Sequence, residues 1–342
     1  MSNVQSAAQL AVILESTCTK IADEAADHSG FVAIRVLLQR FGAELVIRPL
    51  LVEGMLAKRS AAVPEKGHRQ WLVLIDSVKW PFTQDAVAAE SVERPLPERA
   101  RFTIAHELTH SLAYRSTEFG TELQLAAAKN QTSNEFVEKV EDLTDGLVPL
   151  LLWPESRVEA FLQEPGFPLS IDRLVAIRHQ QGISRPVMIY RLRRMIERRR
   201  GGAIEQPANR NVGIGIGEWQ SASKAILRKK PTFVHFDQNI LPEVFLRLRK
   251  EDRLPASSVF ADKDFALCGG NALVTTFDCK SGVDEADGKL PMSVEVTVES
   301  GSRKPGATFF FCVRRVNKGD KPEPLRPLPP AQLQLDESSS GS

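Results

Sequence analysis

The hydrophobic pattern of the first hundred residues indicates helices together with a small sheet. Apolar side chains recur at three- and four-residue spacing through residues 5–41, and Gly42 marks a helix end. The run ELVIRPLLVEG (44–54) predicts a strand that bends at Pro49. WLVLID (71–76) is a short apolar run rich in β-branched residues, which predicts a second strand.

Helical patterns dominate the next hundred residues. In RARFTIAHELTHSLAYR (99–115) the apolar side chains fall on one face at helical spacing. A second helix is predicted from residue 134 onward, and Pro154 stops it. Residues 165–200 carry two shorter helical patterns separated by Gly182, which is the outline of a helix-turn-helix.

The period of the apolar positions changes to two in the C-terminal part of the chain. Polar and glycine-rich sequence around residues 201–211 is typical of a linker. Beyond it, alternating apolar side chains predict strands. These segments are TFVHF (232–236), ALVTTFD (272–278), MSVEVTVES (292–300) and ATFFFCVRRV (307–316).

These patterns place the chain in the α+β class and divide it into four parts. Residues 1–160 are predicted to form a mainly helical domain with a small sheet, and 165–200 a helix-turn-helix segment. Residues 212–320 are predicted to form a C-terminal α+β domain, and the proline-rich stretch 321–342 a disordered tail. A chain of 342 residues is longer than one hydrophobic core usually serves, which fits several domains.

Composition and charge exclude several classes of function. The 44 basic and 43 acidic side chains nearly cancel, so the chain as a whole has no strong attraction to nucleic acid or to an anionic membrane. The N-terminal sequence lacks the cationic start and long apolar stretch of a signal peptide. No apolar run approaches the roughly 18 residues of a membrane span. A cytoplasmic protein that makes no membrane contact is therefore expected.

Three further sequence features, the cysteines, a GIGIG segment and four isolated histidines, do not indicate a binding or catalytic site. The cysteines form no CxxC pair, so Cys18, Cys268, Cys279 and Cys312 are interpreted as buried thiols in a reducing compartment. GIGIG (213–217) lacks the following helix of a dinucleotide site. Four isolated histidines are interpreted as surface or core residues: His28, His68, His179 and His235.

The strongest chemical signal is an HExxH motif formed by His106, Glu107 and His110. Residues four apart lie one turn apart on the same face of a helix, so both imidazoles can bind one zinc ion. Glu107 lies near the metal without binding it, so it can take a proton from a zinc-bound water whose pKa the metal lowers. The alternative is a surface helix with two stray histidines.

A catalytic zinc site also needs a third protein ligand and an open position for water. The predicted helix that begins at residue 134 carries several carboxylates, and spacing alone does not choose among them. The candidates are Glu135, Glu138, Glu141, Asp142 and Asp145. Any one of them could instead belong to a solvated charged face.

The chain contains the motif RFTIAHELTH. A second motif on the next predicted helix has Glu and Asp four residues apart and a terminal Leu-Leu-Trp-Pro. Together the two motifs resemble those of the ImmA/IrrE family of zinc metallo-endopeptidases. The resemblance covers roughly residues 30–195 and implies a zincin-like protease domain with Glu141 as the third zinc ligand. It places Asp145 where the family usually has Asn. Asp145 or Asp142 could orient a ligating histidine.

The chain departs from the family pattern at several positions. Thr109 stands where Gly is usual, and Leu147, Val148 and Trp153 replace a usual Phe, Ala and Met. Pro149 perturbs the end of the ligand helix, two turns beyond Glu141. Tyr114 stands where members often carry His. Its hydroxyl could donate to a tetrahedral oxyanion, or its ring could simply pack.

The resemblance implies peptide hydrolysis in which Glu107 acts as general base. The implied protein substrate is a DNA-binding helix-turn-helix repressor, whose cleavage would relieve transcriptional repression of stress or mobile-element genes. Some family members carry a GAF-like sensor after the helix-turn-helix, and residues 212–320 are compatible with one in size. The alternatives are a non-catalytic regulatory protein that binds DNA or a protein partner, and a component of a toxin-antitoxin or phage-defence system.

An arginine-rich stretch bears on the DNA-binding alternative. It comprises Arg191, Arg193, Arg194, Arg198, Arg199 and Arg200. Arginines on a helix-turn-helix could contact phosphates weakly, or they could form a solvated helix end that suits the C-terminal dipole. A second small basic patch lies at residues 223–230 and has the same two interpretations.

Overall fold

The computed structural model divides the chain into two compact units, residues 1–206 and 207–342. The structure describes residues 2–59, 70–115, 134–162, 171–199, 212–221, 224–227, 233–235, 274–279, 292–299 and 305–316. The helix-turn-helix segment, predicted as a separate part, belongs to the first unit. Within the described residues, no helix is both long and apolar enough to cross a membrane.

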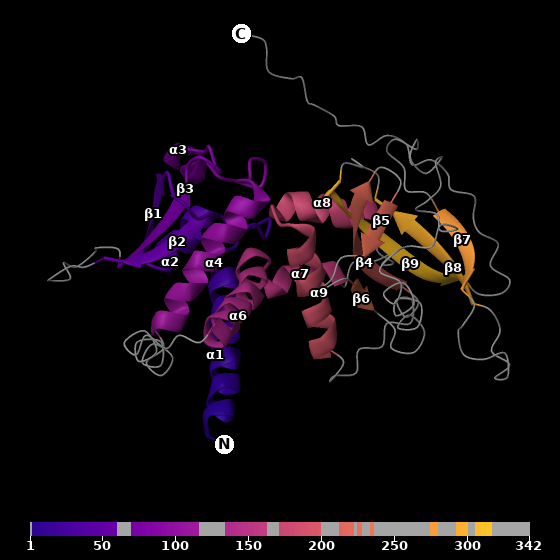
Figure 1. Ribbon diagram of the computed structural model, residues 1–342, viewed down its shortest axis with the longest axis horizontal. Helices are drawn as coiled ribbons and strands as arrows, with labels where there is room; N and C mark the ends of the chain where they lie inside the picture. The colour runs from indigo at the N-terminus through magenta and orange to yellow at the C-terminus, as the bar shows by residue number, and fades with distance from the viewer. Residues whose placement is uncertain are drawn as a thin grey trace, which may run out of the picture. The chain divides into compact units, whose positions relative to one another are not determined.

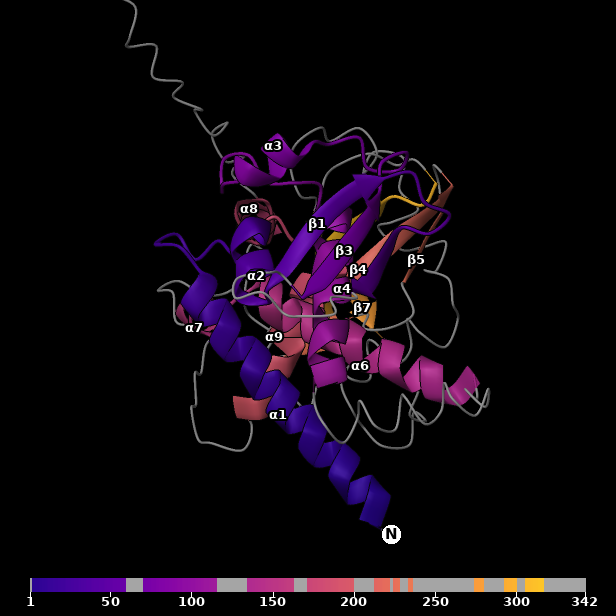
Figure 2. The ribbon, with the colours of Figure 1, turned by 90° about the vertical axis from the view of Figure 1, so that its left-hand side faces the viewer.

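The first unit contains a three-stranded sheet, in which the strands are ordered β1-β3-β2. β3 (Trp71–Asp76) is central and almost fully buried, because its run of apolar side chains suits contact on both faces. β1 (Ala43–Arg48) pairs with it in parallel and β2 (Gly54–Lys58) pairs antiparallel. Figure 2 shows β1 and β3 side by side, with α4 packed behind them.

The prediction of one bent strand over residues 44–54 was wrong. β1 ends at Arg48, and the chain then crosses to the other side of β3 before β2 begins. The Asp76 carboxylate holds this crossing, since it accepts hydrogen bonds from the backbone N–H groups of Leu50 and Val78, each at 3.1 Å. Pro49 therefore lies in a connection between two strands.

Eight helices are described in the first unit (Figure 1). They are α1 (Ser2–Ala25), α2 (Ile34–Arg40), α3 (Gln84–Ala88), α4 (Glu98–Arg115), α6 (Asn134–Leu152), α7 (Glu155–Leu162), α8 (Ile171–Gln181) and α9 (Arg185–Arg199). The predicted helices at 99–115, from residue 134, and on the two sides of Gly182 are confirmed, the predicted helical stretch 5–41 is divided into α1 and α2, and α3 and α7 were not predicted. α4 packs against β2, β3 and α6, while α6 also packs against α1 and α9. The HExxH helix thus lies between the sheet and the helix that carries the acidic candidates.

A buried ion pair fixes the start of α4. The side chains of Arg101 and Glu90 are both fully buried and in contact with each other. Arg101 also donates to the Val32 carbonyl oxygen at 2.9 Å, and Glu90 accepts from the backbone N–H groups of Ile34 at 2.6 Å and of Leu96 at 3.3 Å. Both charges are therefore paired and hydrogen-bonded, which burial of a charge requires.

The helix pair α8–α9 is part of the core of the first unit. Gly182 adopts a φ of 58° between the two helices, a conformation that glycine favours. The side chain of Arg191 is fully buried, and its Nε donates to the Trp153 carbonyl oxygen at 3.0 Å. Arg194 contacts Glu15 of α1. Arg191 therefore presents no charge to solvent, which fits neither a phosphate-contacting face nor a solvated helix end at this residue.

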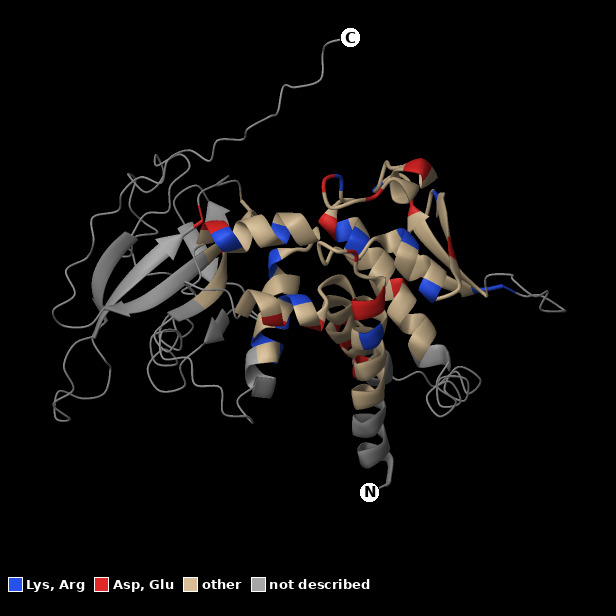
Figure 3. Ribbon diagram, turned by 180° about the vertical axis from the view of Figure 1, so that it is seen from behind, with Lys and Arg blue, Asp and Glu red and all other residues tan. Residues whose placement is uncertain are grey.

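Figure 3 shows the basic residues of α8 and α9 interspersed with uncharged ones. Arg193 is exposed on α9. The side chains of Arg198 and Arg199, and the whole of Arg200, lie outside the described residues.

The second unit contains a six-stranded antiparallel sheet in the order β5-β4-β9-β8-β7, with β6 also paired to β4. Four strands match the predicted segments: β6 (Phe233–His235), β7 (Val274–Cys279), β8 (Met292–Val298) and β9 (Thr308–Val316). β4 (Val212–Ser221) and β5 (Lys224–Leu227) were not predicted. The predicted tail 321–342 lies outside the described residues.

The GIGIG segment is part of β4, and its last glycine, Gly217, is explained by packing. Ile214 and Ile216 are buried, and a side chain at Gly217 would fall 2.1 Å from the Phe309 ring of β9. The absence of a Cβ at Gly217 therefore lets the Phe309 ring lie against the strand. Of the cysteines, Cys18 is a buried free thiol in α1, and burial raises its pKa to about 12.

Candidate metal centre

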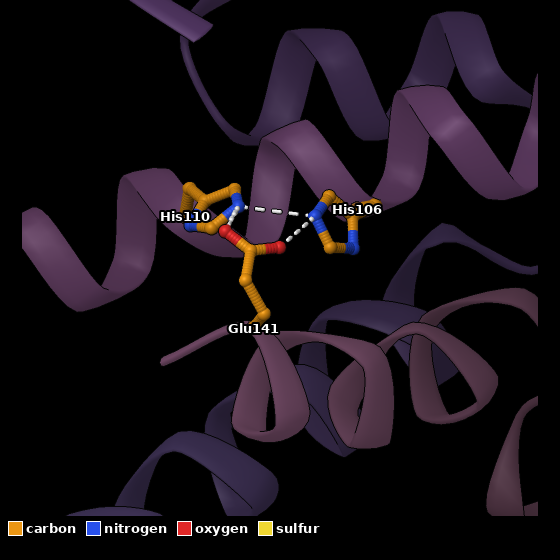
Figure 4. Close-up of side chains that lie close together, drawn as sticks. All are labelled: His106, His110 and Glu141. Atoms are coloured by element: carbon orange, nitrogen blue, oxygen red, sulfur yellow. Dashed lines mark hydrogen bonds and ion pairs between the residues drawn. The ribbon is translucent and has the colours of Figure 1, made fainter. Parts of the chain in front are cut away.

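Two helices bring three metal-binding groups together. α4 presents His106 and His110 one turn apart, and α6 presents Glu141 opposite them (Figure 4). His106 Nε2 lies 3.0 Å from one carboxylate oxygen of Glu141, and His110 Nε2 lies 3.5 Å from the other. The two Nε2 atoms are 3.0 Å apart.

The spacing of these atoms fits a tetrahedral zinc site. One donor atom from each residue can be chosen so that all three lie within 4.8 Å of one another. Zinc bonds of about 2.0–2.1 Å hold tetrahedral ligand atoms about 3.3 Å apart, close to the separations seen here. The histidine side chains are 15% and 12% exposed, and that of Glu141 is 48% exposed. The centre is therefore rigid on the α4 side and accessible to solvent on the α6 side.

Asp145 orients the ring of His106. Its carboxylate oxygen lies 2.9 Å from His106 Nδ1, one helical turn beyond Glu141. This contact leaves Nε2 facing Glu141 and His110. Asp142 and Asp145 were both considered as the carboxylate that orients a ligating histidine. Asp145 is the one that contacts His106.

The charges of the site act differently on the two rings. Burial lowers the pKa of His106, but the hydrogen bond and charge of Asp145, together with Glu107 and Glu141, raise it above its ordinary value. Burial and the neighbouring His106 lower the pKa of His110. His110 is thus held in the neutral form that binds metals.

Removal of the Asp145 carboxylate is expected to weaken zinc binding. Asp145→Ala frees the His106 ring to rotate, and loss of such a supporting group typically costs about 10- to 100-fold in metal affinity. Competition with a chromophoric chelator measures the change. Asp142→Ala is the matched control, because Asp142 is an exposed carboxylate of the same helix. Equal zinc affinities for the two variants would contradict the role of Asp145.

Glu107 is buried between α4 and the edge of the sheet. Its carboxylate accepts a hydrogen bond from the backbone N–H of Leu56 on β2. Burial raises the pKa of Glu107 to about 6, and the charge of Glu141 adds to this rise, while His106 and the Leu56 N–H oppose it. A carboxylate with this pKa can accept a proton near neutral pH and release it again.

Gly54 allows β2 to approach α4 closely. A side chain at this position would lie 2.7 Å from Thr103 Cγ2 and 3.3 Å from a carboxylate oxygen of Glu107. The site therefore depends on a residue type in β2 as well as on the motif in α4. Neither Gly54 nor Leu56 was predicted to belong to the site, because the predicted strand ended at Gly54 and no alternating pattern marks the rest of β2.

The outer edge of β2 is a backbone surface beside the metal centre. Glu53 accepts from the Asp76 N–H at 3.1 Å and Arg59 donates to the Gln70 carbonyl oxygen at 3.0 Å, so the odd-numbered positions bond toward β3. In an antiparallel pair the intervening residues direct their N–H and C=O groups to the other side. Gly54, Leu56 and Lys58 therefore face the sheet edge.

The remaining predicted site residues have varied positions. Tyr114 lies in α4, but its side chain is outside the described residues, as are those of Glu135 and Glu138 in α6. Asp142 is exposed. Of the histidines interpreted as isolated, His179 lies in α8 and contacts Arg178, and the carbonyl oxygen of His28 accepts a hydrogen bond from Arg157.

Comparisons with known proteins leave the family open. No protein-family model matches the chain, and no curated protein matches it. One similar solved structure is a Mycobacterium tuberculosis transcriptional regulator, with 12% sequence identity and a TM-score of 0.41. That match covers 88% of this chain and 75% of the other. By its own features, the chain is an α+β protein with a candidate metal centre between two helices.

Proposed function

We propose that the chain is a zinc-dependent endopeptidase of the ImmA/IrrE type. The observation that carries this proposal is the convergence of His106, His110 and Glu141 next to the buried carboxylate of Glu107. A purely structural site would have no need of a carboxylate with a raised pKa at this place.

Each part of the site has a chemical role in this proposal. A zinc ion, when bound, would supply Lewis-acid polarisation of the scissile carbonyl and lower the pKa of the attacking water. Glu107 would take a proton from that water and pass it to the leaving amine. An extended peptide would be held by hydrogen bonds to the backbone groups of Gly54 and Lys58 and to the Leu56 carbonyl, since the Leu56 N–H already donates to Glu107.

The identity of the substrate follows from the resemblance alone. In this proposal the chain cleaves a DNA-binding helix-turn-helix repressor and so relieves transcriptional repression. The second unit would then serve as a sensor domain. The alternative of a non-catalytic DNA-binding protein is disfavoured by the burial of Arg191 and by the contact of Arg194 with Glu15.

Zinc stoichiometry and peptide cleavage test the proposal together. The purified chain is expected to bind one zinc ion and to cleave members of a proteome-derived peptide library, detected by mass spectrometry. His110→Ala should lose both properties, because zinc cannot be held by the two ligands that remain with comparable affinity. Absence of bound zinc would overturn the metal site. Zinc binding without any cleavage would leave the metal site standing and overturn the peptidase.

A further inference from the structure

The ligand helix α6 has a weak point directly after its ligands. Proline has no backbone N–H, so Pro149 cannot donate to the carbonyl of Asp145, and its ring crowds that carbonyl. Gly146 follows Asp145 and adds backbone freedom. Leu147 and the residues after it are buried in the core, whereas before Gly146 Val140 and Thr144 are buried and Glu141 and Asp145 are exposed. α6 therefore consists of a ligand half and an anchored half that meet at Gly146.

Helix α9 contacts this joint through Tyr190. The Tyr190 hydroxyl would lie 3.0 Å from a Cβ at Gly146, and the ring carbon Cζ would lie 3.9 Å from it. The hydroxyl is itself held in place, since Arg194 donates to it at 3.1 Å and contacts Glu15 of α1. A side chain at residue 146 would therefore press against this hydroxyl, and glycine avoids that contact.

The same helix also holds the far end of α6. Arg191 donates to the Trp153 carbonyl oxygen at 3.0 Å. The anchored half of α6 is thus fixed at its end by Arg191, and the joint is in contact with Tyr190. A shift of the Tyr190 hydroxyl would therefore act on the joint and on the ligand half of α6 that begins there.

We infer that Tyr190 is a positioning residue for the metal centre. Its hydroxyl, held by Arg194, sets the direction of the ligand half of α6 and so the placement of Glu141 and Asp145 opposite the two histidines. This inference rests on the proposed zinc site. It assigns to α9 a role in metal binding.

A double-mutant cycle at the joint tests the inference through zinc affinity. Gly146→Ala places a methyl group against the Tyr190 hydroxyl and is expected to weaken zinc binding about 10-fold, the lower end of the range for groups that support metal ligands. Tyr190→Phe removes the hydroxyl and leaves only the ring contact at 3.9 Å. The double variant Gly146→Ala/Tyr190→Phe is therefore expected to recover most of the lost affinity.

Thermal unfolding of the metal-free proteins separates positioning from simple destabilisation. Alanine favours helix more than glycine does, so the metal-free double variant should unfold no earlier than the wild type. Arg193→Ala, a change at an exposed position of α9, is the control and should leave zinc affinity unchanged.

Two outcomes would overturn the inference while the zinc site stands. Gly146→Ala could bind zinc as the wild type does, or the double variant could remain as weak as Gly146→Ala. A wild type that binds no zinc would instead overturn the proposed function, and the inference with it.

Discussion

Glu107→Gln is expected to lower the rate of peptide hydrolysis by about 100- to 10,000-fold while zinc affinity stays close to that of the wild type. The amide has nearly the shape of the carboxylate but cannot accept a proton from water. It can still accept the backbone hydrogen bond from Leu56, so the approach of β2 to α4 should be kept. Single-turnover cleavage of a peptide substrate, with zinc content measured in the same sample, checks both halves of the expectation.

The pH profile provides an internal control for the role of Glu107. Burial raises the pKa of this carboxyl to about 6, and only the ionised form can act as a base. Hydrolysis by the wild type is therefore expected to decline as the pH falls through about 6, and the residual activity of Glu107→Gln should lack that decline. A variant as active as the wild type would remove the general-base assignment.

Arg101→Met is expected to destabilise the first unit by about 3–5 kcal/mol, the usual effect of leaving one charge of a buried pair without its partner. Glu90 would keep its hydrogen bonds from Ile34 and Leu96 but lose the fully buried guanidinium that contacts it. Urea denaturation followed by circular dichroism measures the change in the free energy of unfolding.

Two further variants make this expectation specific. Arg99→Met removes a largely exposed cation from the same helix, where the ion pair with Glu53 should contribute only about 0–1 kcal/mol. The double variant Glu90→Gln/Arg101→Met should cost less than the sum of the two single changes, because no uncompensated charge remains. An Arg101→Met protein as stable as the Arg99→Met protein would contradict the importance of the buried pair.

The part of the site that depends on local sequence could be predicted, and the part that depends on packing could not. The four-residue spacing of His106 and His110 fixes their common face on any helix. The third group is different, because several carboxylates in the next helix have compatible spacing. Only the packing of α6 against α4 brings Glu141 toward both rings and directs Asp145 to the other nitrogen of His106.

The sequence pattern predicted neither strand β2 nor the burial of Arg191, and both failures have the same cause. GMLAK in β2 has no alternating pattern, and it becomes a strand because β3 offers it a pairing edge. Arg191 belongs to a basic run in the sequence, yet the Trp153 carbonyl and the surrounding core make it an interior residue. Both depend on groups far away in the chain, which a local pattern does not contain.

In the proposed function the outer edge of β2 binds a peptide, but an open strand edge also carries a risk of self-association. A strand at the edge of a sheet is a template for another strand, so an edge suited to a peptide also invites a second copy of the chain. β2 is only five residues long, and the exposed Lys58 lies at its end. Short length and a lysine are two common means by which natural sheets discourage aggregation. Under the proposed function, this strand would combine openness to a peptide with protection against self-association.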